Sequence, residues 1–432
     1  MKKFKYISVL ACLFAQTAFS QPTISPAPKQ SETIAIIGGT IHVGNGKVIN
    51  NGTIVFTNGK ITDVREGNAA PQGVKVIKAD GKHIYPGFIA PVNAMGLTEV
   101  ESVRATRDSR ETGVINPHVR SIIAYNTDSR IIPTVRSNGV LITQATPEGG
   151  LVTGTSSVMQ LDGWNWEDAA YKKDIAIHFN WPSAAIRSGR RAGGASEEQQ
   201  KERYQSQIAE IKSYFLEAKS YAEASKVTVF NARFEAMRGL FTKEKKAFVN
   251  VNDQKDIILA VKFFEEFGIK PVLVGAAEAT EVTAFLKEHQ IPVIMGESHA
   301  LPNNEDDDVN LPYKNAKILN NAGILVAMSV SGYWQQRNLP FMAGTAAAHG
   351  LTKEEALATI TSNTAKILGI DNLTGTLEVG KDANILISAG DALDMLGNQI
   401  NTAFIQGRMI DLNNVQKDLY KKYADKYGIK GE

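Results

Sequence analysis

The stretch that decides the fold is residues 84–97, which read IYPGFIAPVNAMGL. Its apolar residues continue without alternation to Ala90, and a continuous apolar run is typical of a strand that is covered on both faces. The run then passes into a loop, with Val92, Asn93 and Ala94 at the boundary. We therefore expect a buried parallel strand whose carboxyl end opens towards solvent at these three residues.

Beyond this stretch, short apolar runs alternate with segments that have the residue spacing of amphipathic helices. Eight strands separated by helices predict an α/β fold, a (β/α)8 TIM barrel, over residues 85–374. The candidate strands are residues 84–89, 139–145, 175–179, 227–230, 247–251, 271–274, 292–295 and 324–328.

Two capping patterns mark helix starts between these strands. Ser196 and Gln199 have the spacing of a capping box, and so do Thr352 and Glu355. The first of the two helices, residues 196–224, carries charge on several faces. We therefore expect this long helix to be a solvated insertion.

The two ends of the chain have the pattern of short antiparallel strands. Asn-Gly pairs at positions 45–46, 51–52 and 58–59 separate β-type runs, and tight hairpins favour this pair. The β-type pattern returns near residue 375. The ends thus predict a composite β-sandwich domain from residues 34–84 and 375–411, followed by a C-terminal helix in residues 412–432.

Residues 1–20 have the parts of a cleavable secretory signal: a basic start, an apolar stretch, and small residues before a cut between Ser20 and Gln21. The apolar stretch is shorter than the ~20 residues that a membrane span needs. Residues 21–33 are polar and rich in proline, which favours a flexible leader. These features predict a secreted, periplasmic protein without a membrane span.

The composition is that of an ordinary globular chain of 432 residues, with 47 basic residues, 45 acidic residues and a net charge of +2. This balance offers no strongly basic surface for a nucleic acid. The single cysteine, Cys12, lies inside the signal segment. We therefore expect the mature protein to have neither disulfides nor a thiolate metal site.

Several motifs in a fixed order resemble imidazolonepropionase-like members of the amidohydrolase superfamily. The resemblance rests on the Pro86-Gly87 start of the first barrel strand, an opening motif at residues 38–41, a helix at 361–369 and a closing motif at 375–383. It covers nearly the whole mature chain. It implies a (β/α)8 barrel, a divalent metal such as zinc, and hydrolysis of non-peptide carbon–nitrogen bonds.

The positions that this resemblance assigns to the metal hold unsuitable residues. The family uses a His-x-His on strand one, a His after each of strands five and six, and an Asp after strand eight. The matching residues here are Val92, Ala94, Asn250, Gly275 and Ser331. A catalytic divalent metal needs about three ligands from histidine or carboxylate. The resemblance therefore implies no metal cofactor here and a loss of metal-dependent activity.

A neutral polar pocket is the site that we expect in place of the metal. Asn93, Asn250 and Ser331 fall at expected strand ends, where amide and hydroxyl groups offer hydrogen bonds. Arg337, after the last strand, would add a charge for a carboxylate. The expected ligand is a small polar molecule, including an anionic one where Arg337 takes part.

Other residues with reactive side chains have two interpretations each. His178 and His299 near strand ends would help to rebuild a metal site, but single histidines are more often structural. Glu148 is a candidate general base or a turn residue between proline and glycine. Residues 154–157, Gly-Thr-Ser-Ser, look like a nucleophilic loop but have no partner base nearby in the sequence, which favours a plain polar loop. No catalytic residue is assigned.

Two hypotheses of function remain. The first is an amidohydrolase-family protein whose metal-dependent hydrolysis is degraded or lost. The alternative is a non-catalytic protein, which either binds a ligand or assembles as a homo-oligomer or with a related active amidohydrolase.

Overall fold

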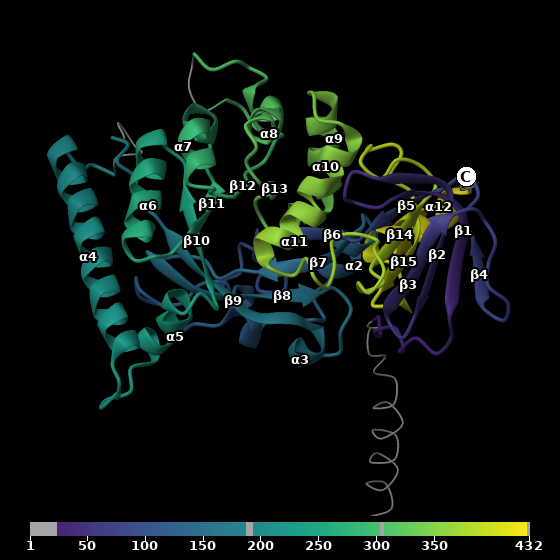
Figure 1. Cartoon of the computed structure of the whole chain (residues 1–432), viewed down its shortest axis with the longest axis horizontal. Coiled ribbons are helices and arrows are strands. Elements are labelled where there is room, and N and C mark those ends of the chain that lie inside the picture. Colours follow the sequence, from purple (N-terminus) through teal and green to yellow (C-terminus); the bar gives the residue numbers. More distant parts are fainter. Residues whose placement is uncertain (1–23, 187–192, 303–305, 430–432) are drawn as a thin grey trace, which may run out of the picture.

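The computed structural model describes residues 24–186, 193–302 and 306–429 (Figure 1). The expected signal peptide of residues 1–20 and its cut at Ser20-Gln21 lie outside these residues. A barrel-like sheet covered by helices forms the larger part of the molecule. A second sheet lies at one end of the long axis, and the long helix α4 (Glu197–Glu223) stands at the other.

The barrel-like sheet has eight strands in chain order from β6 to β13, and it is parallel except for β8, which is antiparallel to both neighbours. The α/β class and a TIM-like barrel are thus confirmed. The strands are β6 (Phe88–Asn93), β7 (Val140–Ala145), β8 (Val152–Gln160), β9 (Ala170–Asn180), β10 (Lys246–Val251), β11 (Pro271–Gly275), β12 (Val293–Met295) and β13 (Val326–Met328).

One of the eight predicted strands is wrong, and one real strand was missed. Residues 227–230 form no strand; they lie in a turn where the side chains of Val229 and Phe230 are 77% and 72% exposed. The missed strand is β8, whose small polar residues do not look like a core strand. Because β7, β8 and β9 form a meander, the regular βα repeat is broken on this side of the barrel.

The barrel sheet has a seam where helices replace strand pairing. Among the described residues no ladder joins β13 to β6. Instead, the Ile360 carbonyl accepts the Ile89 N–H at 2.9 Å, and the Asn363 side chain donates to the Val326 carbonyl at 3.0 Å. The segment at the junction of α10 and α11 therefore covers both open strand edges.

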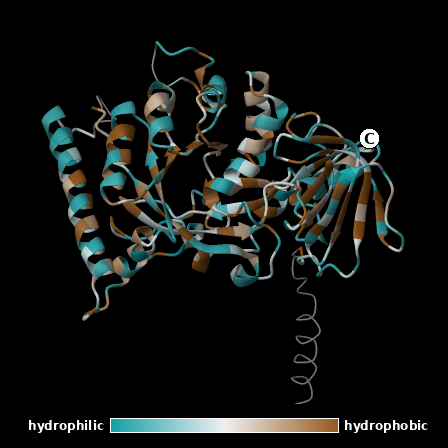
Figure 2. Ribbon diagram, in the orientation of Figure 1, coloured by the Kyte–Doolittle hydropathy of each residue, from teal (hydrophilic) through white to brown (hydrophobic). Residues whose placement is uncertain are grey.

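Helices cover the outside of the barrel sheet, and Figure 2 shows their hydrophobic residues next to those of the strands. Both predicted capping boxes are present, at Ser196 and at Thr352. The helices are α2 (Ile131–Arg136), α3 (Trp166–Ala169), α5 (Ala232–Phe241), α6 (Gln254–Glu266), α7 (Thr283–Glu288), α8 (Leu311–Asn321), α9 (Leu339–Ala348), α10 (Lys353–Thr359) and α11 (Ser362–Leu368), together with α4 and the C-terminal α12 (Val415–Tyr427).

The expectation that α4 is a solvated insertion is wrong. Its residue Phe215 is fully buried, and its ring lies 5.5 Å from Phe179 of β9 and 5.4 Å from Phe264 of α6, measured between ring centroids. Most of the other α4 side chains are exposed, so the charged composition conceals one apolar stripe. The helix is therefore part of the layer that covers the barrel.

The second sheet joins both ends of the chain and has an apolar core of its own. Its path runs β16-β15-β14-β5-β1-β2-β3, with β4 paired to β1, so all eight strands form one hydrogen-bonded sheet. The strands are β1 (Ile34–His42), β2 (Val48–Thr57), β3 (Lys60–Glu66), β4 (Lys75–Lys78), β5 (His83–Pro86), β14 (Ile385–Ser388), β15 (Ile400–Ile405) and β16 (Arg408–Met409).

No helix among the described residues has the length and apolar character to cross a membrane.

Candidate functional site

A layer of polar side chains crosses the barrel interior from β7 to β9. The Gln144 side chain donates to Ser156 Oγ at 3.0 Å, and Ser156 Oγ lies 2.7 Å from His178 Nε2. The Gln144 side-chain oxygen accepts the Val92 N–H at 3.1 Å. Since Phe179 packs outwards against α4 and α6, alternation along β9 turns His178 inwards. This layer therefore lies inside the barrel beside Val92, one of the positions that the sequence resemblance assigns to a metal.

His178 is a neutral structural histidine in this layer. It is 5% exposed, and burial lowers its pKa to about 3. Its ring lies 5.0 Å from that of Phe248 on β10. The serine and histidine that a nucleophilic dyad needs are thus in contact, but no carboxylate of the described residues bonds to the imidazole, and Ser156 is fully buried. The contact stabilises the barrel interior rather than presenting a nucleophile.

Asn93 lies on the other side of the β6–β7 pair. Its side-chain nitrogen donates to the Thr143 hydroxyl at 2.9 Å and to the Ala90 carbonyl, while its oxygen accepts the Met95 N–H. Thr143 and Gln144 are adjacent on β7, so their side chains point to opposite faces of the sheet. Asn93 is therefore separated from the inward-facing layer, and its polar atoms are already engaged.

Asparagine amides from the carboxyl ends of β9 and β10 gather beside the end of β11. Asn250 donates to the Asn180 side-chain oxygen at 3.3 Å. A Cβ added to Gly275, which has a φ of +80°, would come within 2.6 Å of the Asn252 side-chain oxygen and 3.3 Å of that of Asn250. The space above Gly275 is thus occupied by amide groups, and a larger residue there would displace them.

A carboxylate lies just after the carboxyl end of β12. Glu297 follows β12, and its side-chain oxygen accepts both the N–H, at 2.8 Å, and the hydroxyl of Ser331. Glu297, Asn252 and Gly275 together line a cavity of about 190 Å³ between β11, β12 and α8. In the same wall, Asn315 Oδ1 has no hydrogen-bond partner among the described residues. This cavity at the barrel mouth is the best candidate site for a small polar ligand.

Of the predicted residues, Asn250 and Ser331 contact residues of this cavity without lining it, and the remaining ones do not join it. His299 is exposed and its Nε2 lies 2.6 Å from the Thr345 hydroxyl. The Arg337 guanidinium donates to the Trp334 carbonyl and lies over the Trp334 ring. Glu148 is held in its turn by Ser109 and Arg110, as expected of a turn residue.

Two residues of the candidate site were not predicted, although their positions carried a signal. Asn252 directly follows the predicted strand 247–251, and Glu297 comes two residues after the predicted strand 292–295. Ligand-binding side chains of barrels sit at the carboxyl ends of strands. Applying that rule to every strand, rather than to the family's ligand positions alone, would have found both.

The side chains at the barrel mouth do not fit a divalent metal. The matched positions offer two apolar side chains, one glycine, one amide and one hydroxyl. Within residues 24–186, 193–302 and 306–429, no three His, Cys, Asp or Glu side chains group in a way that would hold a metal ion. A water bound by zinc has a pKa near 7, whereas these neutral groups supply no such activation.

Comparisons with known proteins identify relatives of the fold. A sequence model of the amidohydrolase family matches residues 313–415. An amidohydrolase from Thermotoga maritima MSB8 is similar at 22% identity, covering 88% of this chain and 99% of that chain, with a TM-score of 0.75. No curated protein matches the sequence.

Two further solved structures are similar at lower scores. A molinate hydrolase shares 15% identity over 89% of this chain and 95% of that chain, with a TM-score of 0.54. A putative prolidase from Bifidobacterium longum shares 15% identity over 93% of this chain and 100% of that chain, with a TM-score of 0.53. At these identities the matches establish a shared fold, which is that of amidohydrolase and prolidase structures.

Proposed function

We propose that this chain is an amidohydrolase-family protein, of the imidazolonepropionase-like kind, that has lost metal-dependent hydrolysis of carbon–nitrogen bonds. The family match in residues 313–415 and the shared fold support the family. The observation that carries the loss is the donor set at the strand ends, where Asn252 and Asn250 amides crowd the space above Gly275. In this proposal the mouth binds a small polar molecule between the Asn252 amide and Glu297, which both line the cavity.

The chemistry of the mouth suggests which ligands to test. Asparagine amides donate and accept hydrogen bonds, while the Glu297 carboxylate only accepts them. A neutral or cationic molecule with amide or amine donors, such as a urea or an amidine, therefore matches the lining better than an anion. This selects nitrogen-rich compounds, in keeping with the carbon–nitrogen bonds that the family hydrolyses.

The first experiment tests the loss of the metal. Purified mature protein should contain far less than one zinc, iron or manganese per chain by elemental analysis. EDTA should leave its melting temperature unchanged, because no metal-binding free energy would be linked to folding. One equivalent of metal, or a clear decrease in melting temperature with EDTA, would contradict the proposal.

The second experiment tests the mouth as a binding site. Urea derivatives and amidines are screened for an increase in melting temperature, and hits are repeated in Asn252→Leu and Glu297→Gln. Both substitutions should abolish the shift. Asn401→Leu, an exposed change on β15 of the second sheet, is the matched control and should retain it. Hits that persist in the mouth variants would locate binding elsewhere.

Secretion is the remaining part of the proposal, and it rests on the sequence of residues 1–20. Mass spectrometry of protein from its native host should give an amino terminus at Gln21. An intact Met1 would contradict it.

A further inference from the structure

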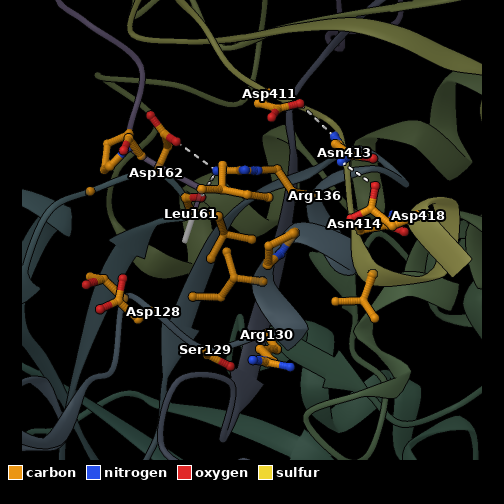
Figure 3. A pocket seen from close by; sticks show the side chains of 18 residues that line it. Asp128, Ser129, Arg130, Arg136, Leu161, Asp162, Asp411, Asn413, Asn414 and Asp418 are labelled. Carbon is orange, nitrogen blue, oxygen red and sulfur yellow. Dashed lines mark hydrogen bonds and ion pairs between the residues drawn. The ribbon is translucent and has the colours of Figure 1, made fainter. Parts of the chain in front are cut away.

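A second cavity lies at the opposite end of the barrel strands from the mouth. Because β8 is antiparallel, its last residues lead away from the mouth, and Leu161 and Asp162 after it line this cavity. The other walls are α2, the start of α12 and residues 24–26 (Figure 3). Its volume of about 690 Å³ is within the range of small-molecule sites.

The wall contains a buried arginine that is only partly satisfied. The Arg136 side chain is 4% exposed, and its Nη1 donates to Asp162 Oδ1 at 2.7 Å and to the Leu161 carbonyl at 3.0 Å. Its Nε and Nη2 are buried and have no hydrogen-bond partner among the described residues. Buried donors of this kind normally have partners, so Arg136 has unused capacity for an acceptor.

The local charges are also unbalanced. Asp162 is shared, because its Oδ2 accepts Arg408 Nη1 at 2.6 Å and the Ala27 N–H at 3.0 Å. In this hydrogen-bonded cluster two guanidinium groups share one carboxylate, while Asp411 acts on Arg136 through its charge without a hydrogen bond to it among the described residues. Burial lowers the pKa of Arg136, while Asp162 and Asp411 act in the opposite direction. A ligand with an anionic group would supply the missing partner.

Carboxylates elsewhere in the wall restrict the kind of anion. One oxygen of Asp411 accepts the Asn413 N–H, and one oxygen of Asp418 accepts the Asn413 side-chain amide. The other oxygen of each carboxylate has no hydrogen-bond partner among the described residues. Besides the guanidinium of Arg130, the lining includes three carboxylates, those of Asp411, Asp418 and Asp128. These groups would repel a phosphate and attract an ammonium group.

We propose that this cavity binds a small zwitterion, an α-amino acid or a dipeptide, with its carboxylate on Arg136 and its ammonium on Asp411 and Asp418. The aliphatic wall of Ile132 and Pro133 gives room for an apolar side chain. Reaching Nε and Nη2 requires a small movement of the lining, and residues 24–26, which belong to no helix or strand, are part of it. This site is independent of the proposed function of the mouth.

Calorimetric titration of the mature full-length protein tests the charge pattern. The probes are L-valine and L-alanyl-L-valine, compared with isovalerate, which lacks the ammonium, and isobutylamine, which lacks the carboxylate. At least one zwitterion should bind, and the singly charged analogues should bind about tenfold more weakly, since charge-assisted hydrogen bonds are the strong ones. No binding of either zwitterion at 10 mM, or equal binding of the analogues, would overturn the proposal.

Variants locate the binding. Arg136→Lys keeps a charge for Asp162 but lacks the unpartnered donors, so affinity should decrease by about tenfold. Asp411→Asn with Asp418→Asn should give a similar loss and tests the site even if Arg136→Lys does not fold. Asp425→Asn, two turns along α12 from Asp418, is the matched control and should bind as the wild type does. Affinity unchanged within about twofold in both cavity variants would overturn the assignment.

Discussion

At the scale of single residues, the barrel interior contains polar groups that depend on one another. Val92 has a φ of +47°, an uncommon conformation for a β-branched residue, and its N–H is held by Gln144. Gln144 in turn contacts Ser156 and His178. The strained backbone at Val92 is thus tied to a buried hydrogen-bond layer.

His178 should make the stability of the protein depend on pH. Its pKa is about 3 when folded and about 6.5 when unfolded, so between these values only the unfolded chain binds the proton. Its contribution is therefore fully present above pH 6.5 and is lost as the pH falls towards 3. The free energy of unfolding should include a decrease of about 2 kcal/mol from this residue between pH 7 and pH 5.

Denaturant unfolding of His178→Gln at both pH values checks this expectation. The variant should lose that part of the pH dependence, while the exposed His299→Gln should retain it. An identical pH dependence in the wild type and His178→Gln would show that another group is responsible.

At the scale of elements, sequence patterns identified most of the barrel but not its irregular side. Seven of the eight barrel strands and both capping boxes correspond to predicted segments. β8 was missed because Gly154, Thr155, Ser156 and Ser157 are small or polar although they are buried, so the strand lacks the apolar signal of its neighbours. The candidate site was only partly predictable, since pairs such as Glu297 with Ser331 join strand ends that are distant in sequence.

The apolar stripe of α4 offers a test of its packing. Phe215→Ala should lower the free energy of unfolding by about 3–5 kcal/mol, because it leaves a cavity among the rings of Phe179, Phe263 and Phe264. Leu216→Ala, at a neighbouring position that is 54% exposed, should change it by less than about 0.5 kcal/mol. Chemical denaturation gives both values. Equal changes in the free energy of unfolding would contradict the packing of α4 against the barrel and support a solvated insertion.

At the scale of the whole molecule, the second sheet makes the two ends of the chain depend on each other. Ile385, Ile387 and Phe404 from the C-terminal strands are buried in the same core as Ile36 and Ile84. By contrast, Ala424 is the buried residue that α12 contributes. The strands near the C-terminus therefore matter more for folding than the helix that follows them.

Two truncated chains separate these roles. A chain that ends at Asn413 lacks α12 and should stay soluble with a cooperative melting transition. A chain that ends at Asn384 also lacks β14 to β16, so it should be insoluble or quickly digested by protease. Equal solubility of the two would mean that the N-terminal strands form a stable sheet without their partners.

The pairing of β5 between β1 and β14 also has a consequence for synthesis on the ribosome. Residues 87–384 separate β5 from β14, a distance of 298 residues. At about 5–20 residues per second, the nascent chain waits roughly 15–60 s before the partner strand emerges. During that interval β5 presents an open edge to other chains. The cell that makes this protein must therefore shield its first fifty or so folded residues, by chaperone or by export, until the last ones are made.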